Sequence, residues 1–267
     1  MLCALSIVTK NGSIASRQYH YTTQSNVNRQ AYTGYTGWTR AGGELLYAIT
    51  DRRLYAGNKA DALARLVDLA AVWAANGVSF IQLREKDLSA RELVELTRAV
   101  IRVVKKPSAS KILVNGSVDV ALAAGTDGVH LPSGPDALTP QEVRSIFAAA
   151  GIARPPVISV SCHTIEDVNV ARQQSPDCIL FAPVFEKVIR ERAIASDVAE
   201  SREAESSVPG SGLVLLEQAC RAAAPVPIFA LGGVTAENAA GCLRAGAGGI
   251  AAIRLMQEPS LTWKHLV

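Results

Sequence analysis

Eight short apolar runs, spaced along residues 45–253, constrain the fold of this chain more than any other feature. Each run is followed by a polar loop and then by a segment with the apolar spacing of a helix. The runs are LLYAIT (45–50), VSFIQL (78–83), KILV (111–114), DGVHL (127–131), VISVS (157–161), CILFA (178–182), VPIFAL (226–231) and GIAAI (249–253). Near-continuous apolar strands of this kind are typical of parallel sheets that are buried on both faces.

The segments between these runs predict helices. Residues 62–75, 90–104 and 212–224 carry apolar side chains at helical spacing, and Thr139 and Thr164 stand where a threonine caps a helix. Eight strand–helix units in about 220 residues predict a closed (β/α)8 TIM barrel. An open doubly wound sheet is the alternative, although that architecture seldom repeats eight times without an irregular insertion.

Two segments depart from this repeat. Residues 186–212, inside the barrel region 44–267, are charged, rich in serine and poor in large apolar residues, so we expect an inserted mobile loop. Such a loop serves either as a lid over the active site or as a surface excursion.

Residues 1–43 contain no Asp or Glu. A transit peptide, a disordered tail and translation from an early start codon all fit this composition, and we expect a dispensable tail.

Charge and cysteine content exclude several classes of partner. The net charge of +3 arises from 27 basic and 24 acidic residues, which is too balanced to predict nucleic acid or a membrane as the main partner. The five cysteines form no C-x-x-C pair, so we expect a reducing, cytoplasmic environment. The four histidines lack the spacing of a ligand pair, and no metal site is predicted. No apolar run approaches the roughly 18 residues of a membrane span. The oligomeric state stays open, a homo-oligomer included.

Polar residues accumulate at the carboxyl ends of the predicted strands, where the active site of a TIM barrel lies. We expect seven side chains to contact a substrate there: Gln82, Arg84, Lys86, Asn115, Ser133, Ser161 and Lys187. Arg84 and Lys86 carry positive charge that suits a carboxylate or a diphosphate. A surface ion-pair network within residues 84–87 is the alternative.

The turn LGGVTAEN (231–238) predicts an anion site. Gly232 and Gly233 allow backbone amides to approach a phosphate closely. The amides near Ile253 and Arg254, at the end of the last strand, are suited to complete the cradle. An ordinary tight turn is the alternative.

His163, in the segment SVSCHT (159–164), is the candidate general base. An imidazole with an unperturbed pKa of ~6.5 both removes and returns protons near neutral pH. A structural or capping histidine is the alternative. Cys162 beside it is either a second acid–base group or an inert, half-buried thiol.

Taken in order, these motifs resemble those of the thiamine phosphate synthase and thiazole tautomerase superfamily over residues 45–256. The matching segments are LYAITD, FIQLREKD, NGSVDVAL, DGVHL, SVSCHT, APVF, ALGGVTAEN and AGAGGIAAI. The resemblance implies a (β/α)8 barrel and a role in preparing or joining the thiazole half of thiamine, with a phosphorylated thiazole as the substrate.

The two branches of this superfamily use different chemistry. A synthase ionises a pyrimidine diphosphate with the help of Mg²⁺, and that branch typically has an Asp after the third-strand Asn and a Thr-x-Thr-Lys run after the sixth strand. This chain has Gly116 and Glu186-Lys187-Val188 at those places, and Asp136 is the remaining acidic candidate. Its NG-x-VD and LPSG segments resemble the tautomerase branch. That branch implies a proton shift that makes a carboxythiazole phosphate aromatic, with His163 at the matching catalytic position.

We therefore expect a thiazole tautomerase that uses neither a metal nor another cofactor. The first alternative is thiamine phosphate synthase, which would use Mg²⁺ and would need Lys187 or Arg190 in place of the missing lysine. The second alternative is a barrel that binds thiazole phosphate without turnover and acts as a regulator or carrier.

Overall fold

The computed structural model describes residues 45–104, 109–134, 136–192 and 203–258, together with two short strands before them, and within 187–206 it describes only the backbone. The chain divides into two units, Met1–Thr33 and Gly34–Val267. In the first unit, β1 (Ile7–Val8) pairs antiparallel with β2 (Ile14–Ala15). The remainder of the predicted tail at 1–43 lies outside the described residues.

Eight parallel strands of the second unit close into a barrel in the order β11-β12-β3-β4-β5-β6-β7-β8. The predicted (β/α)8 barrel is confirmed, and each of the eight apolar runs coincides with one of its strands to within a few residues. The strands are β3 (Leu45–Ile49), β4 (Phe80–Leu83), β5 (Lys111–Asn115), β6 (Gly128–Leu131), β7 (Val157–Cys162), β8 (Cys178–Phe181), β11 (Ile228–Ala230) and β12 (Gly249–Ala252).

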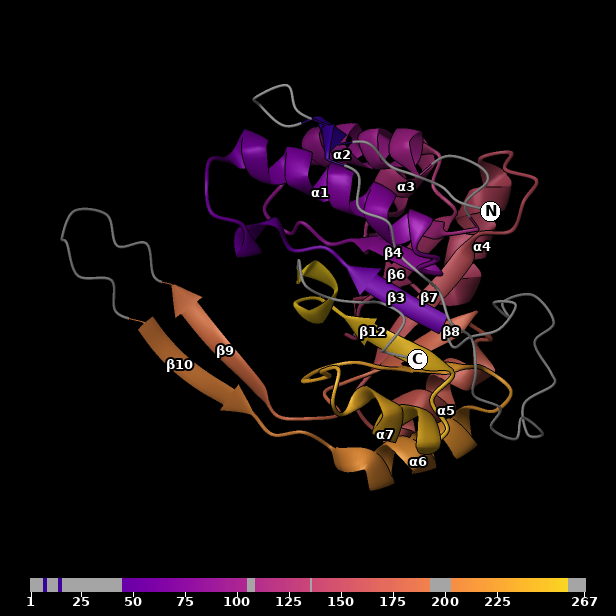
Figure 1. Cartoon of the computed structure of the whole chain (residues 1–267). Helices are drawn as coiled ribbons and strands as arrows, with labels where there is room; N and C mark the ends of the chain where they lie inside the picture. Colours follow the sequence, from indigo (N-terminus) through magenta and orange to yellow (C-terminus); the bar gives the residue numbers. More distant parts are fainter. Residues whose placement is uncertain are drawn as a thin grey trace. The chain divides into compact units, whose positions relative to one another are not determined.

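Helices follow the strands and lie outside the barrel (Figure 1). They are α1 (Lys59–Ala75), α2 (Ala90–Val103), α3 (Val118–Ala124), α4 (Pro140–Ala149), α5 (Ile165–Gln173), α6 (Gly212–Ala223) and α7 (Ala239–Arg244), with short 3-10 turns η1 (Arg52–Leu54) and η2 (Leu255–Gln257). Thr139 and Thr164 cap α4 and α5 through capping boxes, as the sequence predicts. None of the described helices is long and apolar enough to cross a membrane.

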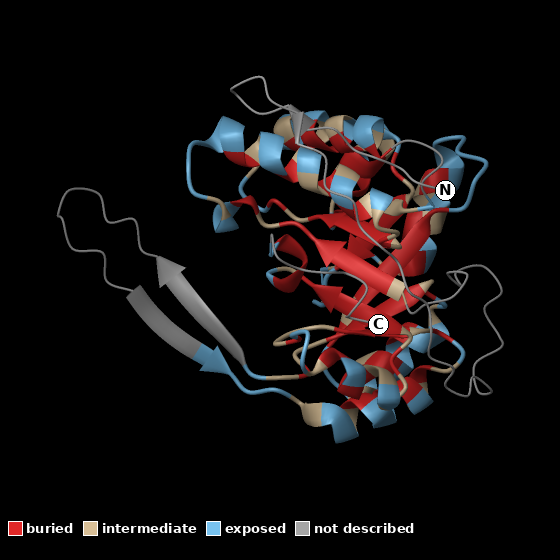
Figure 2. Cartoon of the chain, viewed as in Figure 1, coloured by how far each residue is buried: buried red, intermediate tan, exposed pale blue. Residues whose placement is uncertain are grey.

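The barrel wall separates two apolar cores because side chains alternate between the faces of each strand. Leu46 and Ala48 pack outward with helix residues such as Trp73, so the strands and the inner sides of the helices are buried together (Figure 2). Tyr47 and Phe80 point inward, where their rings lie 5.4 Å apart. Burial of such side chains contributes ~1.5–3 kcal/mol each. The interior is therefore filled below the mouth, and ligands reach only the strand ends.

The segment predicted as an inserted loop contains regular structure. β9 (Lys187–Arg192) and β10 (Glu203–Val208) pair antiparallel, with Lys187 opposite Val208 and Arg192 opposite Glu203. Low apolar content made a structureless loop the expectation, but a two-stranded ladder is built from backbone hydrogen bonds, which the composition does not reveal. The stretch at 193–202 between the strands lies outside the described residues.

Candidate active site at the carboxyl ends of the barrel strands

Two amide side chains meet inside the mouth of the barrel. Gln82 of β4 donates from Nε2 to Oδ1 of Asn115 on β5, at 2.9 Å. Gln82 is 1% exposed, and its Oε1 has no hydrogen-bond partner among the described residues. The structure thus brings together two of the predicted substrate contacts, with a buried acceptor left over.

His130 lies in the barrel interior and bridges two serines of β7. Its Nδ1 lies 2.9 Å from the hydroxyl of Ser159, and its Nε2 lies 2.9 Å from the hydroxyl of Ser161. Burial, with the positive charge of Arg84, lowers the pKa of His130 to about 3, so this imidazole is neutral at physiological pH. No role for His130 is predicted from the sequence. The signal that could have found it is strand alternation, which turns His130, Ser159 and Ser161 to the same interior.

His163 stands at the exposed end of β7 with a defined hydrogen-bond pattern. Its Nδ1 lies 2.5 Å from the carbonyl oxygen of Ala182, and its Nε2 lies 2.9 Å from the hydroxyl of Ser133. Because a carbonyl only accepts, Nδ1 carries the hydrogen, and Nε2 of the neutral ring accepts from Ser133. Burial opposes ionisation of Asp167, but the backbone amides of His163 and Thr164 lower the pKa of its carboxyl group. A carboxylate therefore lies beside the ring.

Cys162 is an inert thiol rather than a second acid–base group. The residue is buried, and burial raises the pKa of its thiol to about 12. The thiol therefore stays protonated at neutral pH, as an inert packing group does.

The charged residues of the QLREKD segment have two kinds of surroundings: the acids pair with a neighbouring arginine, and the basic residues do not form ion pairs with any described residue. Glu85 is buried and accepts from the backbone amide of Arg52 at 3.2 Å and from its Nη1 at 3.0 Å. The Arg52 guanidinium also pairs with Asp87. The alternative of an ion-pair network within 84–87 is therefore wrong in detail, because the acids pair with a residue of η1. Within the described ranges, half-buried Arg84 and exposed Lys86 form no ion pair.

The acidic groups near the mouth do not suit a divalent cation. Asp51 pairs with Arg53 at 2.8 Å, and Glu85 and Asp87 pair with Arg52. Burial opposes ionisation of Asp51, but the hydrogen bonds and charge of Arg53 lower its pKa. In the described part of the chain, no group of three or more His, Cys, Asp or Glu side chains is arranged to hold a metal ion. The residues present therefore do not fit the Mg²⁺ site of a synthase.

Gly116 occupies the position where that branch is expected to carry a metal-binding Asp. Its φ is +72°, a left-handed backbone that glycine adopts without strain. Together with Pro132, Ser133 and Asp136 it lines a shallow hollow between the loops that follow β5 and β6. Asp136 is the one acidic side chain lining that hollow.

The loop after β8 leaves no room for a side chain at either glycine of the pair that follows β11. A Cβ at Gly232 would lie 2.7 Å from Cα of Pro183, and one at Gly233 would lie 2.6 Å from the carbonyl oxygen of Glu186. Both glycines have positive φ, +91° and +64°. Among the described residues, neither amide donates to a protein acceptor. The turn thus packs tightly against the loop after β8 and still offers two amides, with half-buried Ile253 and exposed Arg254 at the end of the neighbouring strand.

The structure brings several of the predicted site residues together at the strand ends. The paired ones are Gln82 with Asn115, Ser133 with His163, and Ser161 with His130. The turn at 232–233 stands at the end of β11. Lys187 begins β9, and its side chain lies outside the described residues. The roles of these residues stay predictions.

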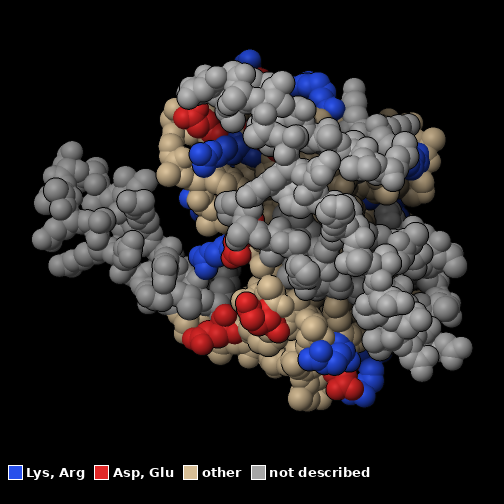
Figure 3. Space-filling model, in the orientation of Figure 1, with Lys and Arg blue, Asp and Glu red and all other residues tan. Residues whose placement is uncertain are grey.

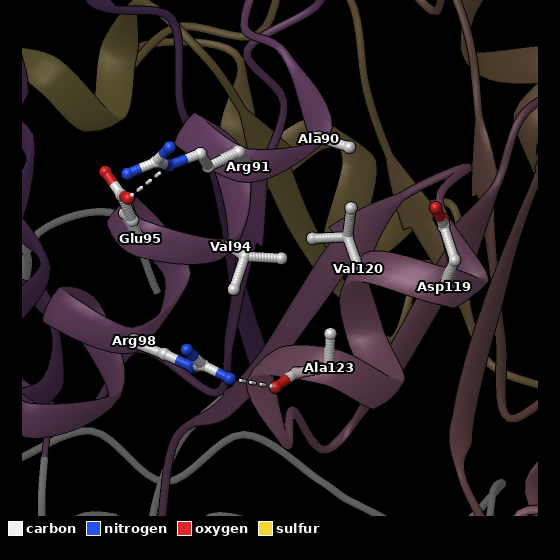
Figure 4. Close-up of a pocket in the computed structure, with 8 residues that line it drawn as sticks. All are labelled: Ala90, Arg91, Val94, Glu95, Arg98, Asp119, Val120 and Ala123. Carbon is white, nitrogen blue, oxygen red and sulfur yellow. Dashed lines mark hydrogen bonds and ion pairs between the residues drawn. The ribbon is translucent and has the colours of Figure 1, made fainter.

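A second hollow lies outside the barrel, between α2 and α3 (Figure 4). Its two arginines already have partners, since Arg91 pairs with Glu95 and Arg98 donates to the carbonyl oxygen of Ala123. On the face shown in Figure 3, basic and acidic side chains of the described residues are interspersed. Both arginines of this hollow are thus engaged, whereas Arg84 and Lys86 at the barrel mouth form no ion pair among the described residues.

Comparisons with known proteins identify the family of this chain. A model of the family described as thiamine monophosphate synthase matches residues 46–256. A "Putative thiamine-phosphate synthase 2" of Aquifex aeolicus is 32% identical over 80% of this chain and 97% of its own length. A "Putative thiamine-phosphate synthase" of Geobacter sulfurreducens is 37% identical over 78% of this chain and 84% of its own length.

A solved structure supports the same relationship. Thiamine phosphate pyrophosphorylase from Pyrococcus furiosus has a TM-score of 0.61 and 25% identity, and the match covers 83% of this chain and 92% of that chain. These names support a role in thiamine biosynthesis, and they favour the synthase alternative over the tautomerase that the motifs suggested first. The superfamily resemblance drawn from the motifs is confirmed, and this chain belongs to the thiamine monophosphate synthase family.

Proposed function

We propose that this protein is an enzyme of thiamine biosynthesis that acts on a phosphorylated carboxythiazole and shifts a proton on its ring without a metal ion. The observation that carries the proposal is the imidazole of His163. Its Nδ1–H is held by the Ala182 carbonyl, so the lone pair of Nε2 is directed at the exposed hydroxyl of Ser133. A base with a defined lone pair beside a binding surface is what a tautomerase requires.

The proton shift needs only groups of this chain. Nε2 of His163 removes a proton from a ring carbon of the non-aromatic tautomer, and the imidazolium then returns a proton to the second ring position. The ring becomes aromatic and His163 is regenerated. Between the two steps, the Ala182 carbonyl and the Asp167 carboxylate stabilise the positive charge.

The two anionic ends of such a substrate have matching groups. The free amides of Gly232 and Gly233 suit the phosphate, and the end of β12 at Ile253 and Arg254 borders the same turn. Arg84 and Lys86, which form no ion pair among the described residues, suit the carboxylate.

Coupling of a pyrimidine diphosphate with the thiazole phosphate is the second candidate, and the names of the relatives favour it. That reaction relies on Mg²⁺ to neutralise the leaving diphosphate. Asp51, Glu85 and Asp87 pair with Arg52 and Arg53 instead, and Gly116 has no side-chain oxygen. Asp136 is the acidic side chain that lines the hollow beside Gly116. In this candidate, Lys187 or Arg190 would supply the missing positive charge.

Both reactions can be measured side by side on the full chain, once with EDTA and once with Mg²⁺. The proposal expects conversion of the non-aromatic thiazole tautomer in EDTA and no release of pyrophosphate. Release of pyrophosphate that depends on Mg²⁺, with no conversion in EDTA, would establish coupling instead. Binding of carboxythiazole phosphate with neither conversion would identify a non-catalytic binder.

A variant pair tests the role of His163. His163→Ala should lower the rate in EDTA by about 10²- to 10⁴-fold while leaving the affinity for carboxythiazole phosphate within about threefold. Glu166→Ala is the matched control, because Glu166 is exposed in the first turn of α5 beside the same loop and should leave the rate unchanged. An unaltered rate in His163→Ala would remove this residue from the mechanism.

A further inference from the structure

Four side chains form a continuous line of hydrogen bonds from the core of the barrel to its mouth. The hydroxyl of Tyr47 lies 2.9 Å from that of Ser159, which lies 2.9 Å from Nδ1 of His130, and Nε2 of His130 lies 2.9 Å from the hydroxyl of Ser161. Tyr47 and Ser159 are fully buried and His130 is 4% exposed, whereas Ser161 is half-buried at the strand end. One end of the line is thus closed off and the other faces the mouth.

We propose that this line has a fixed direction, so that Tyr47, Ser159 and His130 act as positioning residues that make Ser161 a hydrogen-bond donor to the substrate. The inference deepens the function proposed above and rests on it only in supposing an anionic substrate at the mouth.

The direction follows from the buried end. The Tyr47 hydroxyl has one hydrogen, and within the described residues its hydrogen-bond partner is Ser159. Buried hydroxyl hydrogens without an acceptor are avoided in folded proteins, so Tyr47 donates to Ser159. Ser159 then donates its single hydrogen to Nδ1 of His130. A neutral imidazole whose Nδ1 accepts carries its hydrogen on Nε2, and Nε2 donates to Ser161.

The protonation states support this order. Burial raises the pKa of Tyr47 well above its usual value, so the phenol keeps its hydrogen. Burial also lowers the pKa of His130 to about 3, so the ring keeps a single hydrogen at neutral pH. The reverse order would leave the hydrogen of Tyr47 without an acceptor in the apolar interior. In the proposed order, the last hydrogen belongs to Ser161, at the mouth, where a ligand or water accepts it.

Two hydroxyl groups with opposite hydrogen-bonding roles therefore lie at the seam between β6 and β7, which is the place where Ser161 of β7 and Ser133 of the loop after β6 meet the mouth. Ser161 offers a hydrogen, whereas Ser133 gives its hydrogen to Nε2 of His163 and offers lone pairs. A substrate that fits this seam presents an anionic oxygen to Ser161. Selection of that oxygen is therefore set partly by a tyrosine and a histidine that never touch the substrate.

The first experiment reads the tautomer of His130 directly. Nitrogen-15 NMR of the histidine rings in the unliganded full chain separates Nδ1–H from Nε2–H tautomers. The proposal expects the Nε2–H form for His130 between pH 6 and pH 8, which spans the range around an ordinary imidazole pKa of ~6.5. An Nδ1–H form would overturn it. This measurement needs neither turnover nor a variant, so it stands even if both candidate reactions fail.

The second experiment tests the consequence for binding, with carboxythiazole phosphate as the titrated probe in calorimetry. Tyr47→Phe should weaken affinity about three- to tenfold, as expected for loss of one directed hydrogen bond, and should produce a mixture of His130 tautomers. Ser161→Ala should weaken affinity at least as much. The double variant should bind no more weakly than Ser161→Ala alone, because Tyr47 acts only through Ser161.

The matched control is Tyr55→Phe, whose hydroxyl lies against the Gln257 amide and outside this line, and it should leave affinity and tautomer unchanged. Fully additive losses in the double variant, or a Tyr47→Phe protein with mixed tautomers and unaltered affinity, would overturn the positioning role.

Discussion

Alanine at Gly233 should destabilise this protein more than alanine at Gly125, although the two glycines have nearly the same backbone torsion. Their φ values are +64° and +75°. A left-handed backbone costs an ordinary L-residue roughly 1–2 kcal/mol, and both variants should lose that amount. The surroundings differ. A Cβ at Gly125 meets nothing within 4 Å, whereas one at Gly233 would lie 2.6 Å from the Glu186 carbonyl oxygen and 2.7 Å from Cβ of Phe185.

These contacts set the expected size of the difference. The loop after β8 must shift to admit the new methyl group, and overpacking of this kind costs about 1–3 kcal/mol. We therefore expect a loss of about 1–2 kcal/mol in the free energy of unfolding for Gly125→Ala and about 2–5 kcal/mol for Gly233→Ala. Urea unfolding of both variants and the wild type measures the difference, with equal m-values showing that only stability has changed.

The same pair separates stability from binding. Gly233→Ala moves the two amides assigned to the phosphate, so its affinity for inorganic phosphate should fall, whereas Gly125→Ala, at the end of α3, should bind phosphate as the wild type does. Losses of stability that agree within about 0.5 kcal/mol would refute the reasoning, because the loop at 183–186 would then not press on the turn.

Three further outcomes are expected. Glu85→Ala should lower the free energy of unfolding in urea by about 1–3 kcal/mol, because it removes the buried acceptor of the Arg52 backbone amide and of its Nη1 while Asp87 keeps its pair with the guanidinium. Glu95→Ala, which breaks an exposed pair with Arg91, should cost about 0.5 kcal/mol or less, and similar losses in the two variants would contradict the buried pairing. His130 is neutral in the fold, with a pKa lowered to about 3 against ~6.5 when unfolded, so wild-type stability should be complete above pH ~6.5 and decline as the pH falls towards 3. His130→Gln should flatten that decline in urea midpoints taken across this range, and parallel curves would count against a buried neutral ring. Removal of divalent ions with EDTA should leave the melting temperature unchanged, because the described residues form no metal cluster; a fall of several degrees, reversed by Mg²⁺, would point to a site outside them.

The sequence by itself determined the barrel and its family. Strand and helix periodicity are local properties that depend on side chains a few positions apart, and eight repeats leave little choice of architecture. For the same reason, the capping threonines Thr139 and Thr164 could be read directly. The order of the motifs also identified the superfamily, because each motif is a short local segment and can be recognised without knowledge of contacts across the chain.

Only the tertiary structure decided which polar groups are partners. Glu85 is 33 positions from Arg52, and His163 is 30 positions from Ser133, so no local pattern joins them. Barrel closure brings the strand ends together and buries His130 between Ser159 and Ser161, where desolvation keeps the ring neutral and its hydrogen bonds acquire a direction. The hairpin of β9 and β10 was missed for a related reason, since backbone pairing leaves little trace in composition. The sequence gives the order of the residues along the chain. Desolvation of a side chain and its pairing with a distant residue arise only when folding packs distant segments against each other.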